Sequence, residues 1–69
     1  MTIQIINSSA LVEADYDVES HTLTVEFTSG KRYKYHGVPD TVNKKFMKAS
    51  SKGTFFANRI RDIYHSEEL

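Results

Sequence analysis

Two segments constrain this fold more than any other feature of the sequence. In each of them apolar and polar residues alternate, and a glycine turn separates the two. Apolar or aromatic residues alternate with polar ones over residues 21–28 and again over residues 31–36. Such alternation is typical of strands with one face in a core and one face in water. Because Gly30 lies between the two segments, the sequence predicts a β-hairpin. Its apolar side chains are Leu23, Val25, Phe27, Tyr33 and Tyr35.

The length of the hairpin loop decides which face the two tyrosines share. A two-residue loop, residues 29–30, places them with the threonines. A three-residue loop, residues 28–30 with Gly30 in the left-handed conformation, pairs Val25 with Tyr33. We favour this second register because it gathers the apolar residues on one face. The open face then carries Thr22, Thr24, Glu26, Arg32, Lys34 and His36.

The regions on either side of the hairpin predict a further strand region and two helices. Residues 3–6 and 10–17 indicate a first strand region with a bend at the serines between them. Pro39 suits the first position of a helix, and the apolar residues beyond it recur at helical spacing. These residues are Val42, Phe46 and Ala49.

A second helix is predicted after Gly53, capped by Ser51 or Thr54 and ending near His65. The order of elements, strands first and helices afterwards, indicates the α+β class. We therefore expect a small antiparallel β-meander of three to four strands, followed by two α-helices packed on one face.

Length and composition limit what this chain can be. With 69 residues and no cysteine, it has room for one domain over residues 1–69, without disulfides or thiolate metal sites. The first apolar residues have no lysine or arginine ahead of them, unlike a secretory signal. No apolar run approaches the ~20 residues that span a bilayer. We expect a cytoplasmic protein that uses no cofactor or metal.

Charge is segregated along the chain although the formal net charge is zero. All nine lysines and arginines lie between Lys31 and Arg61, where the only acid is Asp40. Residues 1–30 and 62–69 hold the remaining acids. Such a distribution either steers polyanions to one surface or reflects acidic strands lying beside basic ones, and charge alone leaves both open.

Several short motifs occur in an order that is similar to a known family. They are Tyr16-Asp17, Leu23-x-Val25-x-Phe27, Gly30, Tyr33-x-Tyr35, Val38-Pro39, Ala49-x-Ser51-x-Gly53, Phe55-Phe56, Ile60-Arg61 and Tyr64. Together they resemble the KTSC domain, a module named from the carboxy-terminal end of some lysyl-tRNA synthetases and also found as a free-standing protein. The resemblance implies a domain of unknown function for which RNA binding is suggested, and it supplies no catalytic residue.

Basic residues of the central segment are the candidates for contact with phosphates. Alternate residues of a strand are roughly 7 Å apart, close to the spacing of successive phosphates. The lysines after Pro39 share one side of the predicted helix, where like charges are mildly destabilising unless a partner offsets them. The predicted nucleic-acid-binding residues are Arg32, Lys34, Lys44, Lys45, Lys48, Lys52 and Arg61. Arg59 is expected to pair with Asp62, which leaves Arg61 free.

The favoured interpretation is a non-enzymatic module that binds RNA, with tRNA as one candidate, as a monomer or weak homodimer. The alternative is an adaptor or inhibitor that docks the same basic residues onto an acidic protein. A third interpretation is a small metal-free ribonuclease that uses Glu26, His36 and Arg32. The tyrosine pair could stack bases on an open sheet face, but the favoured register makes it part of the core.

Overall fold

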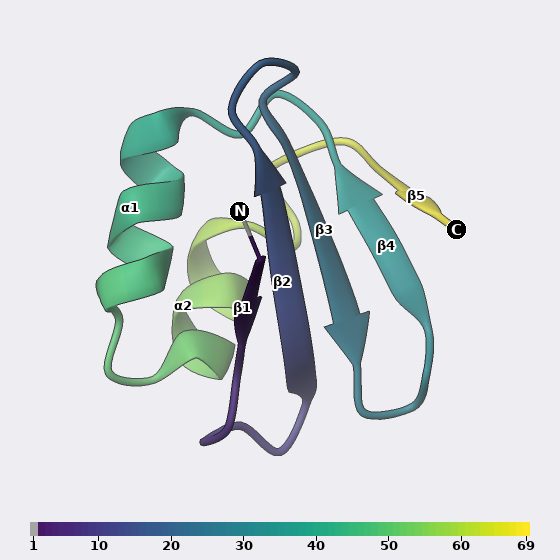
Figure 1. Ribbon diagram of the computed structural model, residues 1–69, viewed down its shortest axis with the longest axis vertical. Coiled ribbons are helices and arrows are strands. Elements are labelled where there is room, and N and C mark those ends of the chain that lie inside the picture. Colours follow the sequence, from purple (N-terminus) through teal and green to yellow (C-terminus); the bar gives the residue numbers. More distant parts are fainter. Residues whose placement is uncertain (1) are drawn as a thin grey trace.

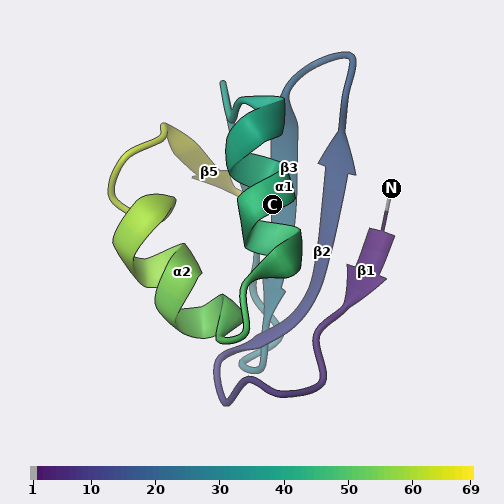
Figure 2. The same cartoon turned by 90° about the vertical axis from the view of Figure 1, so that its left-hand side faces the viewer.

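The computed structural model describes residues 2–69 as a five-stranded antiparallel sheet with two helices on one face (Figures 1 and 2). The strands lie in chain order, each paired with the next. Both helices precede the last strand. The elements are β1 (Thr2–Gln4), β2 (Leu11–Asp17), β3 (Thr22–Phe27), β4 (Arg32–Tyr35), α1 (Asp40–Lys48), α2 (Lys52–Arg59) and β5 (Ser66–Glu68). Neither helix is long and apolar enough to cross a membrane.

The central hairpin has the predicted three-residue loop and register. Val25 lies opposite Tyr33, and Leu23 lies opposite Tyr35. Gly30 has a φ of +93°, in the left-handed region that an L side chain rarely adopts. Loop length therefore places both tyrosines on the core side, and the interpretation of Tyr35 as a core residue is confirmed because it is 3% exposed.

The core lies between the sheet and the helices. Its fully buried side chains are Leu11, Leu23, Val25, Val38, Phe46 and Ile60. A bulge in β2 between Leu11 and Glu13 lets Leu11 and Ala14 both face inward, although they are three positions apart in the sequence. Edge-to-face contacts of Phe56 with Phe27 and Tyr35 join α2 to the sheet.

The amino-terminal region forms two strands where the sequence indicates one bent strand region. The Ser8 hydroxyl accepts hydrogen bonds from the amides of Ala10 and Leu11, at 3.1 and 3.0 Å. These bonds close a turn, so that β1 folds back and pairs antiparallel with β2. The bend predicted at the serines is therefore a complete reversal of the chain.

The carboxy-terminal region also differs from the prediction. Ser51, one of the two expected caps, does cap the second helix, but the helix begins at Lys52, includes Gly53, and ends at Arg59 and not near His65. The chain then turns and adds β5 to the free edge of β4, with Glu67 opposite Lys34. Pairing with β5 gives hydrogen-bond partners to backbone groups of β4 that would otherwise bond to water. These two changes raise the number of strands from the predicted three or four to five.

Candidate nucleic-acid interface

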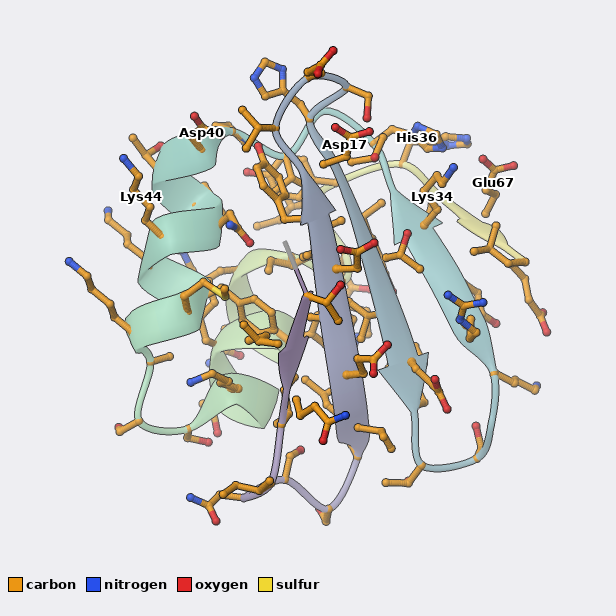
Figure 3. The ribbon with its side chains drawn as sticks, viewed as in Figure 1. Asp17, Lys34, His36, Asp40, Lys44 and Glu67 are labelled. Atoms are coloured by element: carbon orange, nitrogen blue, oxygen red, sulfur yellow. The ribbon has the colours of Figure 1, made fainter. Side chains whose placement is uncertain are left out.

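Three of the predicted phosphate-binding residues form one exposed group on α1. Asn43 and Phe46 face the interior from this helix, so Lys44, Lys45 and Lys48 point to solvent. Lys44 and Lys48 are one helical turn apart, which places their ammonium groups on the same side. Figure 3 shows Lys44 directed away from the body of the molecule. We call these three residues the α1 lysines.

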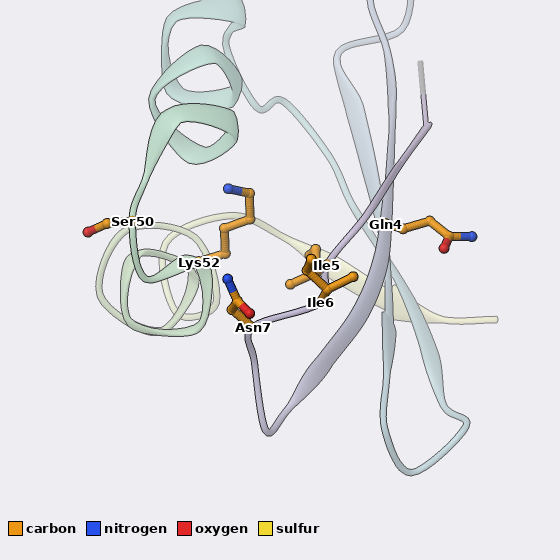
Figure 4. A pocket seen from close by; sticks show the side chains of 6 residues that line it. All are labelled: Gln4, Ile5, Ile6, Asn7, Ser50 and Lys52. Atoms are coloured by element: carbon orange, nitrogen blue, oxygen red, sulfur yellow. The ribbon is translucent and has the colours of Figure 1, made fainter.

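Lys52 lies at the start of α2, a few residues beyond the α1 lysines. Its ammonium group donates a hydrogen bond to the Ala49 carbonyl at 3.1 Å. Its side chain also lines a small cavity of about 90 Å³ between α2 and the segment that follows β1 (Figure 4). Gln4, Ile5, Ile6, Asn7 and Ser50 complete the lining. Lys52 is therefore partly engaged within the protein.

The two arginines near the end of α2 do not make the contacts that the sequence predicts. The Arg61 guanidinium lies 3.5 Å from the Asp62 carboxylate, and both side chains are more than half exposed. Arg59 instead places its guanidinium 5.7 Å from the centre of the Phe55 ring. The prediction that Arg59 pairs with Asp62 was wrong, because Arg59 stacks on a ring of its own helix.

Arg32 and Lys34 lie on the open face of the sheet, away from the helices. Figure 3 shows Lys34 and Lys44 on opposite sides of the molecule. Glu26 is opposite Arg32, and Glu67 is opposite Lys34. Directly opposed residues of neighbouring strands point to the same side, so these acids share the open face with the two bases.

Acids outnumber bases on this open face. Besides Glu26 and Glu67, the register places the acids of β2 on the same side. These are Glu13, Asp15 and Asp17. Hydrogen bonds from the Ser20 side chain and the Glu19 amide lower the pKa of Asp17, which keeps it charged. The predicted basic residues therefore do not meet on one surface: Arg32 and Lys34 lie among acids, and the α1 lysines lie elsewhere.

The residues considered for ribonuclease chemistry do not converge. Glu26 faces Arg32, but His36 is four residues further along the chain, roughly 13 Å at strand spacing. His36 Nε2 lies 2.8 Å from a carboxylate oxygen of Glu67. General acid and base must both reach the reacting atoms, directly or through one water. Across residues 2–69, no three side chains of the metal-ligating types come together either.

A pocket between α1 and the end of β2 was not foreseen from the sequence. The Tyr16 hydroxyl donates a hydrogen bond to the Val38 carbonyl at 2.6 Å. Burial, followed by the neighbouring Asp40 carboxylate and its charge, raises the pKa of Tyr16 to about 12. Asn43 also lines this pocket. A polar residue one turn before Phe46, on the buried side of the helix, is the sequence signal that could have revealed the pocket.

Comparison with known proteins identifies relatives of two kinds. The lysine–tRNA ligase of Trichormus variabilis is 39% identical over 61 residues, covering 88% of this chain but 11% of the ligase. The lysine–tRNA ligase of Nostoc punctiforme is 36% identical with the same coverage. An uncharacterised protein of Stutzerimonas stutzeri is 41% identical over 51 residues, covering 74% of this chain and 72% of that protein. The chain thus spans about a tenth of the ligases.

A solved structure and a family profile agree with these relatives. The crystal structure of a KTSC domain protein from Yersinia pestis superposes with a TM-score of 0.90 and 30% sequence identity. The superposition covers 100% of this chain and 99% of that one. The profile of the KTSC domain matches residues 7–64. This range contains both helices and the whole of strands β2, β3 and β4. The chain therefore belongs to the KTSC domain family.

Proposed function

We propose that this protein is a non-enzymatic RNA-binding module that contacts phosphates through the α1 lysines. The observation that carries the proposal is the exposure of Lys44, Lys45 and Lys48 on one helix whose only acid is Asp40. Like charges one turn apart cost a helix a few tenths of a kcal/mol. A bound polyanion offsets that cost.

The relatives support RNA as the partner. Two of them are lysine–tRNA ligases, enzymes whose name refers to a tRNA substrate. A domain similar to part of such an enzyme, with an exposed row of lysines, is suited to hold an RNA backbone. We propose tRNA or a similar RNA as the partner, bound by a monomer in the cytoplasm. The lack of cysteine fits a reducing compartment.

Binding through lysines to phosphates is driven by the release of counterions. Each phosphate contact on single-stranded nucleic acid contributes about −0.7 to the slope of log K against log salt. The α1 lysines, with or without Lys52, therefore predict a slope of roughly −2 to −3. The acid-rich open face repels phosphates, so Arg32 and Lys34 contribute little.

Fluorescence anisotropy of labelled tRNA and of a mixed single-stranded RNA, over a salt series, tests this proposal. The test variant is Lys44→Glu with Lys48→Glu. The matched control is Arg32→Glu with Lys34→Glu, which changes the net charge equally on the open sheet face. We expect micromolar binding at low salt that the α1 variant loses and the control retains.

Two other results would contradict the proposal. Equal loss in both variants would mean that net charge matters and the α1 surface does not. No binding of either RNA at low salt would exclude RNA as the partner and would favour an acidic protein instead.

A further inference from the structure

A shallow groove, which we call the aromatic groove, lies between the hairpin loop and the turn that joins β1 to β2. Its volume is about 350 Å³, within the roughly 300–1,000 Å³ of pockets that hold drug-sized ligands. Phe27 and Tyr33 line it, and both residues are only partly buried, unlike Tyr35. Their ring centres are 5.7 Å apart, and the ring planes are nearly perpendicular, at 85°. A flat ring in the groove can therefore stack on one of them and meet the other edge-on.

Hydrogen bonds between the two loops hold the walls of the aromatic groove in place. The Thr28 amide donates to the Ala10 carbonyl at 2.9 Å, and the Thr28 hydroxyl donates to the Ser9 carbonyl at 3.1 Å. The Tyr33 hydroxyl donates to Glu68 at 3.3 Å, which orients the ring. Because these bonds form the groove in advance, a ligand does not have to order the loops when it binds.

The aromatic groove adjoins the small cavity beside Lys52 through a third hollow. This hollow, of about 250 Å³, lies at the start of α2. It shares Ser9 and Ala10 with the aromatic groove, and Asn7 with the cavity beside Lys52. Figures 1 and 2 show that the β1–β2, β3–β4 and α1–α2 loops lie at the same end of the molecule. A row of hollows therefore leads along this end from Lys52 to the hairpin loop.

The charges along this row favour an anionic ligand. Lys31 lines the aromatic groove, and Lys52 lines the small cavity. Within residues 2–69, none of the side chains that line the three hollows is an acid. Glu68 contacts the Tyr33 hydroxyl but does not line the groove. The other polar lining consists of hydroxyl and amide side chains, which donate readily to phosphates. Two lysines, a row of donors and a pair of aromatic rings suit single-stranded nucleic acid, which combines phosphates with flat bases.

We propose that the aromatic groove receives one unpaired base of the bound RNA, stacked against Phe27 and Tyr33, with the adjacent phosphate at Lys31. Aromatic side chains stack on any base, so the groove adds affinity without selecting a sequence. The α1 lysines hold phosphates further along the same strand. The molecule measures 28 × 25 × 22 Å, so one short strand reaches both places. This inference rests on the proposed function, since it extends the path of the same RNA.

The test measures the affinity of a labelled single-stranded RNA decamer of mixed sequence by anisotropy, over a salt series. Tyr33→Leu removes the ring but keeps an apolar side chain, and it should weaken binding about five- to thirtyfold. Tyr33→Phe, which restores the ring without the hydroxyl, should restore the affinity. Lys31→Gln should reduce the magnitude of the salt slope by about 0.7. The matched control, Arg32→Gln, removes the same charge from the open face and should leave the slope unchanged. Circular dichroism melts verify folding, and if Tyr33→Leu is unfolded, the slope of Lys31→Gln decides.

The outcomes separate this inference from the proposed function. Unchanged affinity in Tyr33→Leu and an unchanged slope in Lys31→Gln would overturn the base site, while loss of binding in Lys44→Glu with Lys48→Glu would still uphold the α1 surface. Equal weakening by Tyr33→Leu and Tyr33→Phe would also overturn the base site, because the hydroxyl and not the ring would then matter. Losses confined to Tyr33→Leu and Lys31→Gln would uphold the base site and overturn the α1 surface. No binding by the wild type at low salt would overturn both.

Discussion

Removing the Tyr16 hydroxyl tests how the pocket and α1 are held in place. This hydroxyl donates to the Val38 carbonyl at 2.6 Å, and Val38 comes directly before the Pro39 cap of α1. The bond therefore ties the end of β2 to the start of the lysine-bearing helix. Tyr16 as a whole is 3% exposed. Tyr16→Phe keeps its buried ring and removes only the hydroxyl that forms this hydrogen bond.

The size of the expected loss follows from burial. A hydrogen bond contributes about 0.5–1.5 kcal/mol net, and a buried acceptor left without its donor costs about 1–3 kcal/mol. Val38 is 0% exposed, so water replaces the donor poorly. We expect Tyr16→Phe to cost about 1–2 kcal/mol, which lowers Tm by about 4–16 °C in a domain of this size.

The loss should also depend on pH. The pKa of Tyr16 is about 12 in the folded protein, above its ordinary value of 10.0. The folded state thus holds the proton more tightly, and the stability this contributes is complete below pH 10 and is lost as pH rises through 12. The difference in unfolding free energy between wild type and Tyr16→Phe should narrow over that interval.

Urea denaturation followed by circular dichroism measures these differences. The matched control is Tyr33→Phe, whose hydroxyl donates to Glu68 at 3.3 Å in an exposed position. Its removal should change stability by less than about 0.5 kcal/mol. Equal stability of wild type and Tyr16→Phe, or an equal loss in both variants, would refute the account of how α1 is anchored.

Three further substitutions test the packing and the turns, each by thermal melting. Phe46→Ala empties a fully buried site and should cost about 3–5 kcal/mol, leaving little folded protein; a cooperative melt near the wild-type Tm would contradict this. Gly37 has a φ of +71° and open space around it, so Gly37→Ala should lower the free energy of unfolding by about 1 kcal/mol through backbone strain alone. A higher free energy of unfolding in this variant would show that the turn adapts. Ser51→Ala should cost about 0.5–1 kcal/mol, since it removes the cap of α2, and an unchanged Tm would show that the cap is dispensable.

The hairpin could be predicted because two independent signals agreed. Alternation placed Leu23 and Tyr35 on one face, and Gly30 fixed the loop that makes them meet. The last strand could not be predicted in the same way. Ser66–Glu68 has no strand propensity of its own, and it is extended because β4 offers it a free edge. The helical spacing of Ile60 and Tyr64 was misleading, because the helix ends at Arg59 and the chain beyond it turns towards the edge of β4.

The candidate site was predicted only in part. The exposure of Lys44 and Lys48 follows from the apolar stripe of α1, which the sequence shows directly. Their separation from Lys34 could not be predicted in this way, because it depends on which face of the sheet the helix covers. The pocket depends on Asn43 approaching Asp40 and Tyr16, residues whose meeting is set by the crossing from β4 to α1.

The most direct test of the α1 surface is a map of amide chemical shifts in ¹⁵N-labelled protein as unlabelled RNA is added. The account predicts that the largest changes fall on α1 and the first turn of α2, around Lys44, Lys48 and Lys52, while the open-face residues Thr24 and Lys34 stay unmoved. Changes concentrated on the open sheet face, or none at all at low salt, would contradict it.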